Sequence, residues 1–162
     1  MSYLADGGAI RPYRAADASG TLAVFLLSVR ETAAAHYNAQ QVSVWAPEDI
    51  DLAEWAHARA AVATRVAEID GQIVGFTDVD GAGHVGMLFV HPSFGRRGVA
   101  TDLFGTVLAD ARRAGLTTLS VDASLTARAF FERNGFVVDA QQHVERNGVR
   151  LTNFRMRLEL AD

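Results

Sequence analysis

Residues 95–101 have the composition in this chain that best suits binding of a phosphate-bearing group. An apolar stretch stops at Pro92 and is followed by the run Gly95-Arg96-Arg97-Gly98-Val99-Ala100-Thr101. Such a loop at a helix start leaves backbone N–H groups unpaired, and the helix dipole and two arginines add positive charge. Glycine lets a ligand approach the backbone closely, since it has no Cβ. No Gly-Lys-Ser/Thr follows, so we expect a pyrophosphate that serves as a handle, with the chemistry elsewhere.

This segment resembles the acetyl-CoA-binding motif of the GCN5-related N-acetyltransferases (GNATs), which is Gln/Arg-x-x-Gly-x-Gly/Ala after a strand ending near Val-x-Pro. Gly98-Val99-Ala100 matches the second half of the motif, and Val90-His91-Pro92 matches the strand end. Gly95 stands where the family usually has Gln or Arg, which removes one side chain but no backbone donor. The resemblance implies contacts to acetyl-CoA from these residues: Leu88, Phe89, Val90, Arg96, Arg97, Gly98, Val99, Ala100 and Thr101.

Residues 124–136 carry a second match, to the family's later CoA-contacting helix, written Ala-x-x-Phe-Tyr-x-x-x-Gly-Phe. Ser124 or Thr126 is expected to cap a helix that Gly135 ends in a left-handed conformation. The resemblance implies that CoA is contacted here by four residues: Ser124, Phe130, Phe131 and Arg133. The two motifs and the strands between them cover roughly residues 62–160.

Phe131 occupies the place of the tyrosine that in this family usually protonates the leaving thiolate. We expect water or Ser124 to deliver that proton instead. A thiol pKa near 8.5 makes the thiolate a tolerable leaving group even without a dedicated acid.

Length and composition bound the remaining possibilities. A chain of 162 residues suits one domain, so we expect a single N-acetyltransferase domain over residues 1–162. No run approaches the ~20 apolar residues of a membrane span, and no secretory signal precedes the domain, so we expect a cytoplasmic protein without membrane partners. The net charge of −4 gives no general attraction to nucleic acid. The absence of cysteine and the scattered positions of the five histidines argue against a metal site.

The turn signals and apolar runs predict an α/β domain. Asp70-Gly71 and Asn147-Gly148 predict two hairpins, and residues 84–91 predict a buried strand. Residues 99–114 are expected to be helical, and residues 119–121 form a further short strand. The resulting order βαα-βββ-α-β-α-ββ implies a mixed, mostly antiparallel sheet flanked by helices. The GNAT resemblance adds that the strands carrying Val90 and Val121 splay apart and hold the pantetheine arm of acetyl-CoA between them.

The N-terminal third is predicted to be a strand at residues 10–14 followed by helices. Asp17 is expected to cap the first helix, which residues 31–45 continue. Pro47 with its acidic neighbours is expected to open another helix.

The last strand does not alternate cleanly between apolar and polar residues. Val149 and Leu151 share one phase, whereas Phe154 and Met156 share the other. A bulge near residues 152–153 explains this pattern, and so does a strand that is buried on both faces. The sequence leaves both explanations open.

Acetyl transfer requires a base for the acceptor amine, and His84 is our candidate. Counting back from the anion loop, it falls at the strand position where several GNATs carry a catalytic glutamate. An imidazole suits proton abstraction near neutral pH. Asp78 and Tyr37 are reserve candidates, and backbone N–H groups near Leu88 are expected to polarise the thioester.

Tyr37, Gln41 and Trp45, at spacing i, i+4 and i+8, are candidates for the acceptor-binding wall, although aromatic residues at this spacing also serve simply as packing. The acceptor itself is a small-molecule or peptide amine of unspecified kind, and a homodimer is left open. Two alternatives remain at this point. One is a non-catalytic acyl-CoA-binding module with the same fold; the other is an unrelated nucleotide-binding domain, which the two antiparallel hairpins disfavour.

Overall fold

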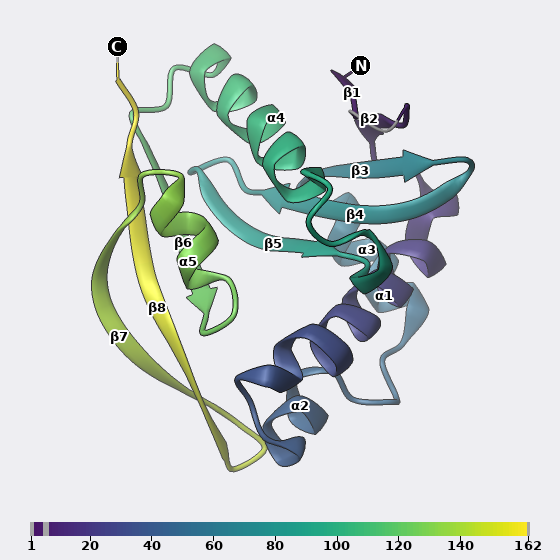
Figure 1. Cartoon of the computed structure of the whole chain (residues 1–162), viewed down its shortest axis with the longest axis vertical. Helices are drawn as coiled ribbons and strands as arrows, with labels where there is room; N and C mark the ends of the chain where they lie inside the picture. The colour runs from purple at the N-terminus through teal and green to yellow at the C-terminus, as the bar shows by residue number, and fades with distance from the viewer. Residues whose placement is uncertain (1, 5–6, 162) are drawn as a thin grey trace.

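A single mixed sheet is the centre of the computed structural model, which describes residues 2–4 and 7–161 (Figure 1). Its strands are β1 (Ser2–Tyr3), β2 (Ala9–Pro12), β3 (Ala63–Ile69), β4 (Gln72–Val79), β5 (His84–Val90), β6 (Thr118–Ser124), β7 (Val137–Arg146) and β8 (Val149–Glu159). They lie in the order β1-β2-β3-β4-β5-β6-β8-β7, and among the described strands only β5 and β6 pair in parallel. The predicted mixed, mostly antiparallel sheet and both predicted hairpins are confirmed.

Helices cover both faces of this sheet. They are α1 (Ala18–Leu27), α2 (Ala39–Trp45), α3 (Leu52–Ala60), α4 (Val99–Arg113) and α5 (Arg128–Arg133). The first three share an apolar core with one face, centred on Phe25 and Phe76. The last two share a core with the other face, centred on Phe104 and Met156. The sheet therefore separates two helical layers (Figure 1).

Strands β5 and β6 pair only where they begin. Their parallel register consists of His84↔Ser120 and Val85↔Val121. Beyond these pairs the two strands diverge toward Val90 and Ser124 (Figure 1). The backbone groups on the facing edges beyond the paired residues are thus available to a ligand, as the sequence analysis anticipated.

A bulge in β5 helps to bend this strand away from its neighbour. Val79 pairs with Val85 and Asp78 with Met87, which leaves Gly86 as an extra residue. A Cβ at position 86 would lie 2.5 Å from Asp78 Oδ1, so this position accepts only glycine without rearrangement. The Asp78 side chain therefore fills the space beside Gly86, a contact between neighbouring strands that the apolar pattern does not reveal.

Strand β8 is buried on both faces, at different ends. Leu151 belongs to the core beneath α1 and α2, whereas Phe154 and Met156 belong to the core beneath α4 and α5. The register shift of this hairpin lies in β7, between Val138 and Ala140. The bulge near residues 152–153 is therefore wrong, and burial on both faces explains the change of phase, because the strand passes from one helical layer to the other.

The helical prediction for residues 31–45 is right except at residues 36–38, where the chain turns, so these residues do not form one continuous helix. A π-helix (Ser28–Thr32) and a 3-10 turn (Ala33–Ala35) end the first helix, and the chain turns before α2. Asn38 caps α2, because its Oδ1 accepts from Gln41 N at 2.8 Å and Gln41 Oε1 accepts from Asn38 N at 2.9 Å. This capping box is a sequence signal that the apolar periodicity obscured. Pro47 opens no helix either: α3 begins at Leu52 after its cap, Asp51.

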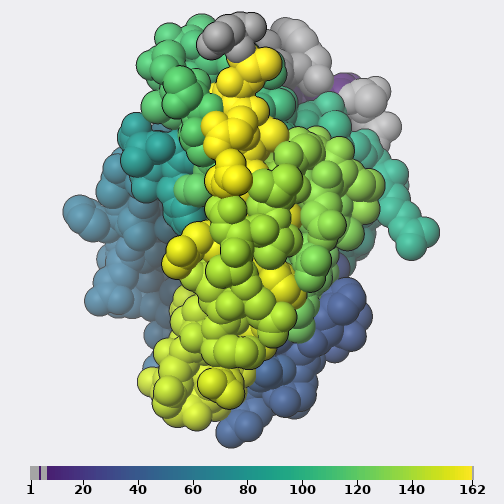
Figure 2. All heavy atoms as spheres, turned by 90° about the vertical axis from the view of Figure 1, so that its left-hand side faces the viewer, coloured from purple at the N-terminus to yellow at the C-terminus, as the bar shows by residue number. Residues whose placement is uncertain are grey.

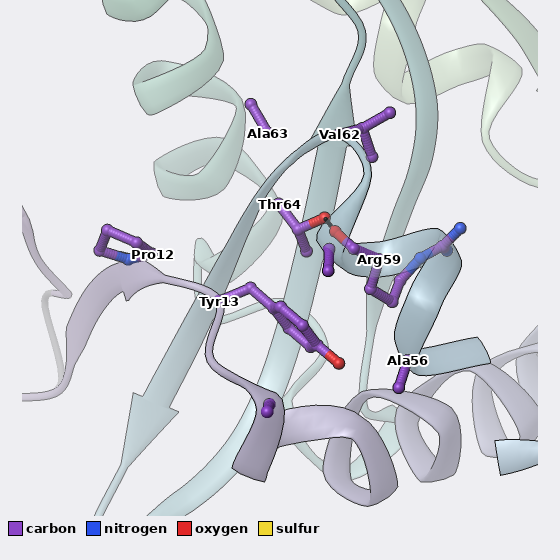
Figure 3. A pocket seen from close by; sticks show the side chains of 9 residues that line it. Pro12, Tyr13, Ala56, Arg59, Val62, Ala63 and Thr64 are labelled. Carbon is purple, nitrogen blue, oxygen red and sulfur yellow. Dashed lines mark hydrogen bonds between the residues drawn. The ribbon is translucent and has the colours of Figure 1, made fainter. Parts of the chain in front are cut away.

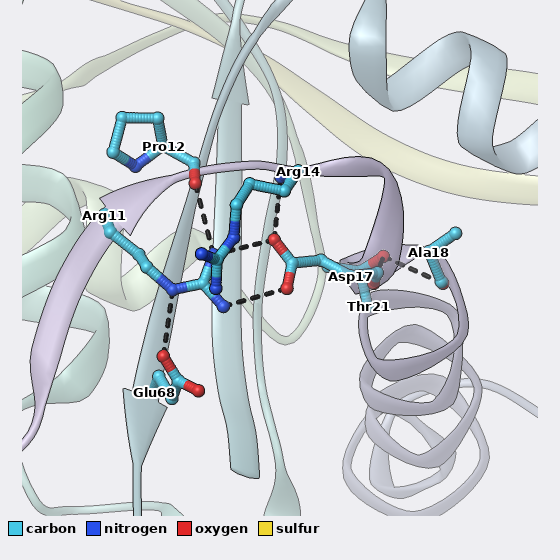
Figure 4. A network of polar contacts seen from close by, with 7 residues as sticks. All are labelled: Arg11, Pro12, Arg14, Asp17, Ala18, Thr21 and Glu68. Carbon is cyan, nitrogen blue, oxygen red and sulfur yellow. Dashed lines mark hydrogen bonds and ion pairs between the residues drawn. The ribbon is translucent and has the colours of Figure 1, made fainter. Parts of the chain in front are cut away.

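Asp17 precedes α1 as predicted, but its carboxylate does not cap that helix. It binds the Arg11 guanidinium through two contacts of 2.8 and 2.9 Å, and it accepts from Arg14 N at 2.8 Å (Figure 4). Arg11 also donates to Glu68 on β3 at 2.9 Å. The hydrogen bonds from Arg11 hold the pKa of Asp17 below its usual range. This network joins the start of α1 to β2 and β3.

Candidate active site

A cavity of about 760 Å³ opens between the diverging strands. Its walls come from β5, β6, the loop before α4, the segment between α1 and α2, and the β7–β8 hairpin. Figure 2 shows the outer surface of that hairpin in yellow-green and yellow, with blue N-terminal helical segments at its lower end. The cavity has two ends. We call them the loop end, near Gly95, and the hairpin end, near Leu151.

The loop end is formed by backbone in an uncommon conformation. Gly98 precedes α4 with φ of 79°, and Arg96 also has a positive φ of 63°. The first helical hydrogen bond of α4 runs from Asp102 N to Gly98 O. The N–H groups of the preceding residues therefore have no partner within the helix and lie at its positive end. No other residue of the described chain lies within 4 Å of a Cβ built on Gly98, so a ligand can approach there.

The residues predicted to contact CoA divide into two sets. Eight line the cavity: Leu88, Phe89, Val90, Arg96, Ala100, Ser124, Phe130 and Phe131. Val99 is buried in the core beneath α4, and Thr101 and Arg133 are exposed outside the cavity lining. Arg97 lies over the Phe94 ring, 5.2 Å from its centroid. For Gly98, Val99 and Thr101, any contact with the anion falls to the backbone rather than to a side chain.

The second motif adopts a strand end, a turn and the short helix α5. Ser124 ends β6, and its Oγ accepts from Ala127 N at 3.0 Å, so it stabilises the turn and not the first residue of α5. Gly135 ends the helix with φ of 93°, as predicted. Phe131 is 2% exposed and packs against Phe104 on α4. One edge of Phe131 still reaches the cavity.

The predicted acceptor wall is assembled differently from the expected helical face. Tyr37 lies before α2, yet its ring contacts Trp45 at a centroid distance of 5.3 Å, and both residues line the cavity. The Tyr37 hydroxyl donates to Thr152 O at 2.6 Å and accepts from Leu125 N at 2.9 Å. Gln41 lies outside the cavity lining, because its side chain caps α2 and donates to Arg150 O at 2.9 Å. The single-face arrangement of the three residues is therefore wrong.

His84 lies at the inner limit of the cavity, where β5 and β6 still pair. Its Nδ1 is 2.8 Å from Ser120 Oγ, and its Nε2 is 3.6 Å from Asp122 Oδ2. Its side chain is 37% exposed and faces the cavity together with Asp122. Sequence reasoning missed Ser120 and Asp122, because their contact with His84 arises only from the parallel pairing of two distant strands.

The two reserve bases are less suitable than His84. Asp78 is 4% exposed, lies beneath Arg59 at 3.3 Å and is absent from the cavity lining. Burial raises the pKa of Asp78, but this carboxyl does not line the cavity and so has no direct contact with a ligand bound there. Burial also raises the pKa of Tyr37, so this phenol stays protonated at neutral pH. The position of Asp78 outside the cavity and the protonated phenol of Tyr37 therefore leave His84 as the better candidate base.

A second cavity of about 350 Å³ lies between α3, the start of β3 and the segment that follows β2 (Figure 3). Its lining is mainly apolar, with polar groups from Tyr13, Arg59 and Thr64. The Thr64 hydroxyl donates to Arg59 O at 2.6 Å. This cavity shares no lining residue with the larger one. We place the chemistry in the larger cavity, because the predicted site residues line that one.

Searches for metal and membrane features gave negative results within residues 2–4 and 7–161. No group of three or more His, Cys, Asp or Glu side chains is arranged to hold a metal ion there. None of the helices in this part of the chain combines the length and the apolar character that a membrane span needs.

The fold and the cavity define an α/β protein with a splayed strand pair and a helix start whose first N–H groups have no partner within the helix. A family model for the acetyltransferase (GNAT) domain matches residues 33–158. The chain is 42% identical over 149 residues to the uncharacterized N-acetyltransferase YafP of Escherichia coli (strain K12), across 91% of this chain and 93% of YafP. The chain therefore belongs to the GNAT family, and it is an N-acetyltransferase.

Solved structures agree with this assignment. A GCN5-related N-acetyltransferase from Rhodopseudomonas palustris, 35% identical, matches 99% of this chain and 98% of its own with a TM-score of 0.91. The PaiA N-acetyltransferase of Thermoplasma acidophilum, solved in complex with coenzyme A, matches 95% of this chain and 99% of its own with a TM-score of 0.79. PaiA is 16% identical, so this second likeness concerns the fold alone.

Proposed function

We propose that this enzyme transfers the acetyl group of acetyl-CoA to a primary amine by direct attack on the thioester, within one catalytic domain formed by residues 1–162. The observation that carries the proposal is the continuous cavity that runs from the helix start at Gly98, through the gap between β5 and β6, to the hairpin end. Coenzyme A needs a pyrophosphate site and a slot for an extended arm, and these two features lie in line here.

The loop end suits the coenzyme because it offers donors without a competing side chain. The unpaired N–H groups at the start of α4 bind the pyrophosphate, and Arg96 adds a positive charge. The backbone of β5 beyond its bulge pairs with the pantetheine arm, and an N–H group near Leu88 or Phe89 polarises the thioester oxygen. Alignment of the two reactants in one cavity supplies much of the remaining acceleration, up to ~7–11 kcal/mol in ideal intramolecular cases.

His84 accepts the proton of the acceptor ammonium, directly or through a water molecule. Support comes from its place at the inner limit of the cavity and from its neighbours, Ser120 Oγ at 2.8 Å and Asp122 Oδ2 at 3.6 Å. The gap to Asp122 is too long for a hydrogen bond and suits a bridging water or ammonium group. Asp122 also stabilises the imidazolium that forms when the proton is taken.

Water supplies a proton to the departing thiolate, directly or through Ser124, which takes up a proton from that water as it gives its own to the sulfur. The Ser124 oxygen already accepts from Ala127 N, so its own O–H remains free to donate into the cavity. This role falls to Ser124 because Phe131 has no hydroxyl.

A non-catalytic acyl-CoA-binding module is the second candidate function, and the phenylalanine at position 131 is the observation that favours it. Thiol release from acetyl-CoA across a panel of small amines, amino acids and short peptides separates the two. We expect saturable, acceptor-dependent thiol release. Saturable binding of acetyl-CoA without thiol release from any acceptor would assign the chain to the binding module instead.

A further inference from the structure

Strand β5 reverses its alternation at the bulge beside Gly86. Before the bulge, Val85 packs in the core beneath α4 and α5. After it, Leu88 and Val90 pack on that same side of the sheet, whereas Phe89 packs in the core beneath α1. Side chains two residues apart share a face in a regular strand, so Val85 and Leu88 share one only because of the extra residue. The bulge therefore exchanges the two sets of residues that follow it.

Backbone groups alternate along a strand in the same way, and upstream of the bulge the odd-numbered residues face β6. Gly83 O accepts from Ser120 N at 3.0 Å, and Val85 pairs with Val121 in the parallel register. Without a bulge, this alternation would continue along β5 and direct the N–H group of Phe89 into the gap between β5 and β6.

Downstream of the bulge, the even-numbered residues face the gap instead. Met87 O accepts from Thr77 Oγ1 on β4 at 2.8 Å, which places the backbone groups of Met87 on the β4 side. His91 N donates to a carbonyl oxygen of β4 at 2.8 Å, in phase with Met87. The N–H group of Phe89, in that same phase, points toward β4, and that of Leu88 points into the gap.

The carboxylate of Asp78 occupies the inside of the bulge. Its Oδ1 accepts from Met87 N at 3.1 Å. Burial raises the pKa of Asp78, against the opposing effects of Arg59 and of hydrogen bonds from the N–H groups of Met87 and Gly86. Arg59 on α3 holds the other oxygen, with its Nη1 3.3 Å from Asp78 Oδ2. A bulge leaves N–H groups without a partner in the ladder, and this carboxylate supplies the missing acceptor.

We propose that Asp78 is a positioning residue for acetyl transfer: it accepts from the bulge N–H groups and keeps the strand phase in which Leu88 N–H meets the thioester oxygen. The donor is then the N–H group of Leu88 and not that of Phe89. A donor must lie about 2.7–3.1 Å from the developing oxyanion, so a shift of phase by one residue removes it. This inference rests on the proposed attack on the thioester and names the side chain that aims its backbone donor.

The test compares two double variants that differ in whether the side chain at position 78 can accept a hydrogen bond. Asp78→Asn keeps an oxygen acceptor, whereas Asp78→Leu has a similar shape and no acceptor. Both carry Arg59→Met, because a buried guanidinium without its anion would by itself destabilise the fold. Asp17→Asn is the matched control, since it changes another buried carboxylate that pairs with an arginine, outside the cavity lining.

We expect the double variant with Asp78→Leu to lose about 10²–10³-fold in kcat relative to the one with Asp78→Asn, as on removal of one oxyanion donor. The Kd for CoA, which has no thioester, should change little, because the start of α4 is untouched. Asp17→Asn should lose stability but keep the wild-type kcat. Equal kcat values for the two double variants overturn the inference.

The infrared stretch of the thioester carbonyl, labelled with carbon-13 in bound acetyl-CoA, separates aiming of the donor from general damage. A hydrogen bond to the oxygen weakens the C=O bond and lowers this frequency. The frequency should be low in the wild type, in Asp17→Asn and in the double variant with Asp78→Asn, and higher in the double variant with Asp78→Leu. A stretch that is the same in both double variants contradicts the role of Asp78.

A measurement on the wild type tests the inference even if a double variant does not fold. Amide NMR compares the complexes with CoA and with acetyl-CoA. The amide proton of Leu88 should shift downfield when acetyl-CoA replaces CoA, whereas that of Phe89, which faces β4, should not. A shift at Phe89, or none at Leu88, overturns the inference. These spectra require only bound acetyl-CoA, so an absence of thiol release with every acceptor overturns the proposed function separately.

Discussion

The two ends of the cavity are built in different ways. The loop end consists of one continuous segment, from Val90 through the start of α4, and the groups that we propose to bind the coenzyme there are mainly backbone N–H donors. The hairpin end is assembled from the α1–α2 segment, β6, β7 and β8, and its groups are side chains such as Tyr37 and Asp122. The difference explains how one fold can keep a common acetyl donor while its acetyl acceptors vary. Backbone N–H donors survive most substitutions, whereas each side chain at the hairpin end can change independently.

The attachment of α1 to β2 and β3, in the helical layer that leads to the hairpin end, should depend on a buried ion pair, and Asp17→Asn tests this most strongly. Asp17 and Arg11 form a pair that is 6% and 11% exposed, and the substitution removes the two-contact partner of the buried guanidinium, which then keeps Glu68 as its anionic neighbour. We expect a loss of about 3 kcal/mol in the free energy of unfolding at pH 7. Chemical denaturation measures this loss.

The pH dependence of that loss follows from the lowered pKa of Asp17. The stabilisation is fully present above the ordinary carboxyl pKa near 4 and disappears as the pH falls through the lower pKa of the folded state. The difference between wild type and Asp17→Asn should therefore shrink below about pH 4. Asp110→Asn is the control on the other layer. Its pair with Arg65 is 26–29% exposed, and its loss should cost less than about 1 kcal/mol. Equal costs for the two variants would contradict the contrast between the layers.

Gly98→Val tests the backbone character of the loop end. Valine is strained at φ of 79°, so the N–H groups before α4 should lose their alignment. Acetyl-CoA at a hundred times its Kd should stabilise the wild type by about 2.7 kcal/mol, and the variant should lose this shift while remaining folded. Gly105→Ala, on an exposed turn of α4, should keep the full shift and gain about 0.5–1 kcal/mol of stability. A full shift retained by Gly98→Val would show that the pyrophosphate binds elsewhere.

His84→Ala tests whether a side chain performs the proton transfer. We expect kcat/KM to fall by about 10²-fold at neutral pH with saturating acetyl-CoA. The acidic limb of the pH–rate profile that belongs to the base should disappear. The charged or polar groups that surround this histidine are Asp78, Asp80, Ser120 and Asp122.

His57→Ala is the matched control for this measurement, because His57 is exposed on α3 outside the cavity lining. It should retain the wild-type profile. A His84→Ala enzyme with the same limb and a near-normal rate would leave alignment and a water chain as the mechanism.

Phe131→Tyr should have the smallest effect, because it restores a hydroxyl whose role we assign to Ser124 or water. We expect kcat to change by less than tenfold in either direction. Acetyl-CoA binding, measured by thermal shift, should persist, since one edge of the ring faces the cavity. Loss of all binding would instead show that the packing of Phe131 against Phe104 leaves no room at the thiol channel.

The hairpins, the anion loop and α4 were predictable from sequence because each depends on a few neighbouring residues. Asp70-Gly71 and Asn147-Gly148 specify turns, and the glycines at positions 98 and 135 adopt the left-handed conformations that their places require. Two local capping signals were overlooked. Missing the capping box at Asn38 and Gln41 misplaced α2 and the predicted face of Tyr37, and missing the Asp51 cap misplaced the start of α3.

What the tertiary structure decided is everything that depends on residues far apart in the chain. The partners of His84 come from β6, 36 residues or more further along the chain. The phase change in β8 arises because Leu151 and Met156 face different helical layers. Sequence patterns report backbone preferences, which are local. Side chains that meet across a sheet are set by strand order and register, and these follow only from packing of the whole domain.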